Sequence, residues 1–279
     1  ADYFSQALKL DRVNWPAAIG MVSVYIKKAQ IDKAIDFLNG VDENLARYPD
    51  IARAKIDLYE KKNDYSSALR IAIDNIKSAP KDFSRYRIAF ELSRKLNDKV
   101  KAEEICRNCI DMNSDTPEAF MLFGEFYQWN NQISLQEEYA AKALAIDPLF
   151  SPALLLLVAR DTLKEDINSA MSKYEKILLN DPNNAGAINN VALLMLKRGD
   201  NPWAVVNKAQ EAIALDPSNP LIYSTIGQGF YAMGKFANAR AAFENALRFG
   251  PDYPVINYYA GLNYIKDNKP DLAKEHLRK

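Results

Sequence analysis

The feature that most constrains this chain is a repeat with a period of 34 residues. Large aromatic residues recur at this spacing or its multiples, with one extra residue before the fourth: Tyr25, Tyr59, Tyr127, Phe230 and Tyr264. Alanines form a second series, at Ala34, Ala68, Ala102, Ala170, Ala239 and Ala273, and prolines a third, at Pro80, Pro148, Pro182, Pro217 and Pro251. A period of this length indicates stacked supersecondary units that bury a continuous core between neighbours.

The clearest single unit spans residues 220–253. Tyr223, Ile226 and Phe230 recur at i, i+3 and i+7, which is the spacing of one helix face. A second helix carries small and large apolar residues in alternation and ends before Pro251, because proline lacks the amide hydrogen that would continue it. The unit is therefore expected to be a helical hairpin.

This pattern resembles the tetratricopeptide repeat family, whose large, Leu, Gly and Tyr positions match Tyr223, Ile226, Gly227 and Phe230. The resemblance implies an all-α fold, an α-solenoid of tandem hairpins that forms a right-handed superhelix. We expect a single array over residues 1–279. Its parts are the tail of a preceding repeat at 1–14, full repeats at 15–48, 49–82, 83–116, 117–150, 151–184, 185–219 and 220–253, and a partial repeat at 254–279.

Three glycines are expected to lie where the two helices of a hairpin meet. Gly124, Gly227 and Gly261 are expected to let the second helix approach the first closely, and large residues fill the gaps beside them.

Asp161 stands where other repeats carry an aromatic residue, so it would need a partner if buried, with Arg160 and Lys164 as candidates. Neither end has a polar capping helix, which predicts a segment of a longer repeat protein.

The sequence offers little for catalysis, and we expect no enzyme activity, no catalytic residue, no metal site and no cofactor. The only histidine is His276, in the last, partial repeat, which leaves no room for a triad. A CxxC motif is present at Cys106 and Cys109, but both fall where other second helices carry packing residues such as Phe243 and Ala246. A structural role in the core is expected, with a redox or metal role as the open alternative.

Partner binding is the expected activity, because stacked first helices line a concave groove in solenoids. The resemblance implies that positions 2, 5, 9, 12 and 13 of each repeat face this groove. The candidate partner-binding residues are Arg53, Arg87, Arg94, Met121, Trp129, Leu155, Asn189, Leu193, Leu196, Gln228, Tyr231 and Tyr258. The set is charged in the early repeats and apolar or tyrosine-bearing later, which is typical of an interaction surface.

The expected function is a non-catalytic scaffold that binds a peptide or a partner helix. The groove lacks the lysine and asparagine clamp of repeat domains that bind chaperone C-termini, because Asp57 and Glu91 would repel a carboxylate. Acidic and basic residues balance at 36 each, so no bulk attraction to nucleic acid is expected, and no apolar stretch has the ~20 residues of a membrane helix. Two alternatives stay open: a regulatory arm of an enzyme whose catalytic domain lies outside the segment, and self-association through the uncapped ends.

A second, narrower resemblance concerns the bacterial envelope. The stretch from Asn189 to Leu194, the pair Gly199-Asp200 and the end of that repeat at Leu215 to Pro220 are similar to repeats of envelope lipoproteins. These accompany exosortase-type sorting and exopolysaccharide export. The resemblance implies a periplasmic location, whereas the residues alone leave cytoplasm and periplasm open.

Overall fold

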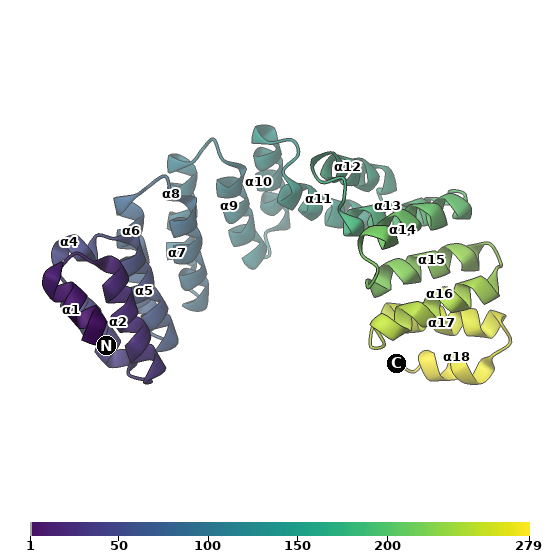
Figure 1. Cartoon of the computed structure of the whole chain (residues 1–279). Helices are drawn as coiled ribbons and strands as arrows, with labels where there is room; N and C mark the ends of the chain where they lie inside the picture. Colours follow the sequence, from purple (N-terminus) through teal and green to yellow (C-terminus); the bar gives the residue numbers. More distant parts are fainter. Residues whose placement is uncertain (1) are drawn as a thin grey trace. The chain divides into compact units, whose positions relative to one another are not determined.

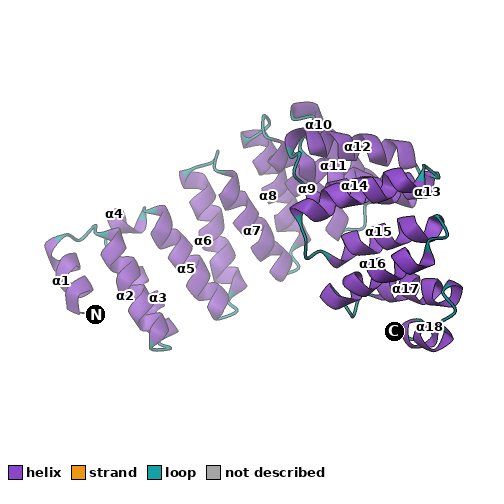
Figure 2. Ribbon diagram, turned by 45° about the vertical axis from the view of Figure 1, so that its right-hand side comes forward, coloured by secondary structure: helices purple, strands orange, loops and turns teal. Residues whose placement is uncertain are grey.

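The computed structural model describes residues 2–279 as a succession of helices joined by short turns (Figures 1 and 2). Over that range there are 18 helices and no strand, which confirms the expected all-α class. The chain divides into two compact units, the first ending at Ile146 and the second spanning Asp147–Lys279.

Apart from α1 and the short α4, both units are built from pairs of helices, a first and a second helix to each repeat. The helices of the first unit are α1 (Asp2–Leu10), α2 (Trp15–Lys27), α3 (Ile31–Asn39), α4 (Glu43–Ala46), α5 (Pro49–Lys61), α6 (Tyr65–Ser78), α7 (Phe83–Lys95), α8 (Lys99–Met112), α9 (Pro117–Trp129) and α10 (Ile133–Ile146). Those of the second unit are α11 (Ser151–Leu163), α12 (Ile167–Asn180), α13 (Ala185–Arg198), α14 (Pro202–Leu215), α15 (Pro220–Ala232), α16 (Phe236–Phe249), α17 (Pro254–Lys266) and α18 (Pro270–His276). Within each unit a second helix packs against its own first helix and against the next one.

Every hairpin turn between a first and a second helix contains one residue with a positive φ. These residues follow the repeat period: Ala29, Asn63, Asn97, Asn131, Glu165, Gly199, Gly234 and Asn268. Glycine and asparagine adopt this left-handed conformation most readily, and they occupy six of the eight positions. The extra residue of the repeat at 185–219 lies just after Gly199, so the turn absorbs it and both helices keep their faces.

The two helices of a hairpin meet through side chains of complementary size. At Gly227 a Cβ atom would lie 2.7 to 2.8 Å from three atoms of the Phe243 ring, so the ring occupies the space that glycine leaves. Gly261 and Leu277 repeat this arrangement. The expectation of close packing at glycine is confirmed at these two positions.

Gly124 differs from that expectation. A Cβ at this position would find its nearest neighbour, the carbonyl oxygen of Gln136, at 3.8 Å, which is an ordinary contact. The corresponding residue of the second helix is Ala140, too short to fill the gap, and the rings of Phe123, Tyr127 and Tyr139 pack nearby. Glycine is therefore not required here by close approach.

Asp161 is largely buried and has a partner that the sequence did not single out. Lys173 of α12 extends its ammonium to Asp161 Oδ2 at 2.5 Å and also contacts Ser169 Oγ at 2.6 Å. The pair compensates the charge of a carboxylate at a position that is aromatic in most repeats.

The first repeat departs from the regular hairpin. Its second helix, α3, has 9 residues, whereas the other complete second helices have 14. After Gly40 the chain turns, and Asp42 Oδ1 accepts a hydrogen bond from the backbone of Asn44 at 2.8 Å to begin the four-residue helix α4. Leu45 anchors α4 in the core of the unit. The last turn of an ordinary second helix is thus missing between α3 and α5.

Candidate partner-binding groove

Three first helices of the second unit, α13, α15 and α17, form one side of that unit, because α15 contacts both of the others. Between them lies a groove with a volume of about 630 Å³. This volume is in the range of sites that hold small molecules or side chains of a partner. Its apolar lining comes from all three helices: Leu193, Leu196, Leu221, Tyr231, Val255 and Tyr259.

Polar side chains gather on the α13 and α15 walls of the groove. The amide nitrogen of Asn190 donates to the Tyr174 hydroxyl at 2.9 Å, and the Thr225 hydroxyl donates to the Leu221 carbonyl at 3.0 Å. Gln228 Nε2 lies 3.4 Å from the Ser224 hydroxyl. These contacts hold the polar side chains in fixed orientations.

Asn189 is the exception in this network. The residue is 4% exposed, lines the groove, and its Oδ1 has no hydrogen-bond donor among the described residues. Leaving a buried acceptor unpaired costs about 1–3 kcal/mol. Because this oxygen is itself buried from solvent, an N–H group of a ligand can reach it only after the Asn189 side chain rotates toward the groove.

The structure brings together five of the residues proposed from the sequence. They line one groove from two helices: Asn189, Leu193, Leu196, Gln228 and Tyr231. Tyr258 is 52% exposed but does not line it; its neighbour Tyr259 does, with the two rings in edge contact at 5.2 Å. Leu155 is exposed on α11 and also lies outside the groove lining.

The residues proposed in the first unit are engaged with their own chain. Arg53 pairs with Asp57 at 3.0 Å, and Arg94 pairs with Glu91 at 3.2 Å. Arg87 forms an ion pair with Glu125, and its guanidinium lies over the Phe83 ring at 5.7 Å.

Met121 and Trp129, both on α9, offer less surface than expected. Met121 is 7% exposed, because α9 packs against α7, α8 and α10, and the expectation that it is an exposed groove residue is wrong. Trp129 is half-buried, and the Lys99 ammonium lies 5.5 Å from the centre of its ring.

Sequence reasoning missed the sixth position of each repeat, which contributes Asn190, Thr225 and Tyr259 to the groove. Positions 2, 6, 9 and 13 are spaced by four, three and four residues, so they form one stripe of a helix. Helical spacing applied to the repeat would have found these residues, whereas the family's position rule alone did not.

The cysteines lie in the core of the first unit, and both are free thiols. Burial raises the pKa of Cys109 to about 12 and that of Cys106 further, so neither forms the reactive thiolate at neutral pH. Cys106 and Phe90 belong to the same core cluster. Over residues 2–279 no three His, Cys, Asp or Glu side chains come together as metal ligands, and no described helix is long and apolar enough to span a membrane.

The helical architecture of this chain is similar to that of proteins with solved structures. No family model matches the chain. A structure of the APC/C hetero-tetramer Cut9-Hcn1 is similar over 90% of this chain and 49% of its own, with a TM-score of 0.56 and 19% identity. PilF of Pseudomonas aeruginosa is similar over 70% of this chain and 88% of its own, with a TM-score of 0.56 and 14% identity. The fold is that of a tetratricopeptide solenoid.

A curated relative resembles this chain in sequence as well. It is a BBSome complex member, a BBS4 homolog of Drosophila melanogaster, 26% identical over 188 residues. The match covers 67% of this chain and 38% of the relative, so the chain spans well under half of that protein's length. The narrower resemblance to envelope lipoproteins stays a prediction.

Proposed function

We propose that this chain is a non-catalytic protein-interaction scaffold, and that the groove between α13, α15 and α17 binds an apolar segment of a partner protein. The apolar side chains that three helices bring to one groove carry the proposal, and the unpaired Oδ1 of Asn189 in the groove wall adds a hydrogen-bond acceptor. A partner segment that places apolar side chains against Leu193 and Tyr231 and donates an N–H group to Asn189 meets both conditions.

The tetratricopeptide fold supports this proposal, because solenoids of this kind stack their first helices into an extended binding surface. The groove has one charged lining residue, Lys197, so apolar contact and hydrogen bonding are its means of recognition. The balanced charge of the chain gives no bulk attraction to nucleic acid.

A charge placed in the groove tests the proposal. Leu193→Lys introduces a cation at the centre of the apolar surface, and partners captured from cell extract are expected to be lost. Leu179→Lys on α12 is the matched control, because it makes the same exchange at a leucine that is 73% exposed and outside the groove. If both variants retain the same partners, the groove is not the binding surface.

Asn189→Leu supplies an independent measurement. Replacing the unpaired acceptor by an apolar side chain of similar size is expected to stabilise the free protein by about 1 kcal/mol. The same substitution is expected to weaken partner binding, because the ligand's N–H group loses its acceptor. A variant that is both less stable and fully active in binding would contradict the role given to Asn189.

A further inference from the structure

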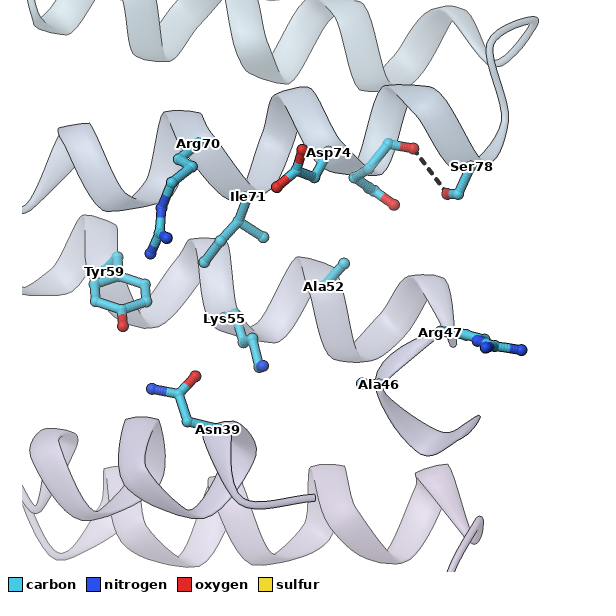
Figure 3. Close-up of a pocket in the computed structure, with 11 residues that line it drawn as sticks. Asn39, Ala46, Arg47, Ala52, Lys55, Tyr59, Arg70, Ile71, Asp74 and Ser78 are labelled. Atoms are coloured by element: carbon cyan, nitrogen blue, oxygen red, sulfur yellow. Dashed lines mark hydrogen bonds between the residues drawn. The ribbon is translucent and has the colours of Figure 1, made fainter. Parts of the chain in front are cut away.

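A second cavity lies in the first unit, at the place where α3 is shortened. Its volume is about 470 Å³, and its walls come from α3, α4, α5 and α6 (Figure 3). Ala52 on α5 enlarges it, since the fourth position of the repeat carries larger residues at Tyr86, Phe120 and Leu154. The missing helical turn and the small residue together open the cavity between the second helices α3 and α6, against the first helix α5. Its lining shares no residue with the groove of the second unit.

Lys55 on the floor of this cavity is unusual within the array. It occupies the seventh position of its repeat, where the other seven carry apolar residues: Met21, Ala89, Phe123, Leu157, Val191, Ile226 and Ala260. Lys55 is partly buried, and burial lowers the pKa of its ammonium. A lysine in this environment has lost hydration without gaining a counter-charge.

Two arginines line the same cavity. Arg70 reaches from α6 toward the space beside Tyr59, while Arg47 lies at the rim with its side chain directed away from Lys55 (Figure 3). In the described part of the chain neither arginine, nor Lys55, has a carboxylate oxygen within 4.0 Å. The cavity therefore contains cations without an internal ion-pair partner.

The other polar groups of the cavity do not cancel this charge. Asp74 is the carboxylate of the lining, and it pairs with Lys77 at 2.8 Å. The side-chain oxygen of Asn75 accepts from Arg85 at 3.0 Å, which leaves the Asn75 amide nitrogen as a donor. Tyr59 adds a hydroxyl group that can donate as well.

We propose that this cavity binds a phosphate group. An oxyanion satisfies the unpaired cations and the neutral donors at the same time. A phosphate monoester carries a charge of about −1.5 to −2 at neutral pH, so it gains more from two or three cations than a single carboxylate does. The cavity is larger than one phosphate, so the group that carries it has room, whether that group is a small molecule or a phosphorylated side chain.

Titration calorimetry on the whole chain at constant ionic strength tests the proposal. The probes are inorganic phosphate, a phosphoserine pentapeptide with glycine neighbours, and the same peptide with serine or glutamate in its place. Binding of phosphate or of the phosphoserine peptide, at least ten-fold tighter than the serine and glutamate peptides, is the expected result. Free phosphate alone would indicate a small phosphorylated ligand, and the peptide alone a phosphorylated partner. Equal affinity for the serine peptide, or no heat with any probe, would overturn the proposal.

The variants separate a built site from general surface charge. Lys55→Met places in this repeat the residue that Met21 provides in the preceding one, so the fold is expected to be retained. This variant is expected to lose at least ten-fold in affinity for the phosphorylated probe. Lys61→Met, on the exposed side of the same helix, changes the net charge equally and is expected to keep the affinity. Equal losses in both variants would mean that only net charge attracts the probe. Leu193→Lys in the other unit leaves this site unchanged, so the two proposals fail independently.

Discussion

The packing of Gly227 against Phe243 leads to a quantitative prediction about two glycine-to-alanine substitutions. Alanine in place of glycine inside a helix normally stabilises by about 0.5–1 kcal/mol. At Gly124 the new methyl group meets nothing closer than 3.8 Å, so Gly124→Ala is expected to show this gain. At Gly227 the methyl group would lie 2.7 to 2.8 Å from the ring of Phe243, which is 1% exposed and cannot move aside freely.

Overpacking of this kind costs about 1–3 kcal/mol, which outweighs the gain in helix propensity. Gly227→Ala is therefore expected to destabilise its hairpin by about 1–2 kcal/mol. Hydrogen exchange read by mass spectrometry measures the opening free energy of α9 and α15 separately, which avoids assuming one cooperative transition for the whole array.

A double-mutant cycle identifies the cause of the loss. Phe243→Ala alone is expected to cost about 3–5 kcal/mol, and the pair Gly227→Ala with Phe243→Ala is expected to cost less than the sum of the two. Additive effects, or a Gly227→Ala variant as stable as Gly124→Ala, would refute the steric argument.

Three further predictions concern other parts of the molecule. A maleimide at pH 8 is expected to label neither Cys106 nor Cys109 in the folded protein and both in urea, since burial raises the pKa of each thiol; intact mass measures the labelling. Glu165 has φ of 59°, so Glu165→Asn is expected to stabilise by ~0.5 kcal/mol in thermal unfolding, and a loss of stability would contradict strain at this turn. Burial lowers the pKa of His276, whose Nδ1 lies 2.7 Å from Asn257 Oδ1. The unfolded chain therefore binds the proton more readily, and the α17–α18 hairpin is expected to lose protection as pH falls below about 6.5, a dependence that His276→Gln removes.

The regular part of the fold can be predicted from the sequence, because each 34-residue repeat carries the same pattern of apolar, small and turn-forming residues. Helices, turns and the small-against-large packing at Gly227 are all encoded within one repeat. The left-handed residues at Asn63, Asn97 and Asn131 carry the same period, so they too were available in the sequence. The all-α hairpin architecture is confirmed, whereas the extent and unity of the array stay predictions.

The features that escaped prediction depend on contacts between helices or on a change within one repeat. Lys173 reaches Asp161 from another helix, and no spacing rule within the first helix of the repeat indicates this pair. The shortening of α3 depends on the balance between continuing a helix past Gly40 and starting a new one after Asp42. Met121 is buried because several helices meet on α9, which a single-repeat position rule does not contain.

The turn residues with a positive φ also mark the positions at which whole hairpins can be added to this chain or removed from it. The segment that follows Asn97 and ends at Asn131 begins and ends in the same backbone conformation, with φ of 55° and 56°. A block cut at these joints can be duplicated or removed, and the chain on either side continues along an equivalent path. Unequal crossing-over between such joints changes the array by whole hairpins. The block that ends at Asn63 is different, because it carries the shortened α3 and Lys55 but not α6, so a copy of it duplicates only part of the cavity beside Lys55.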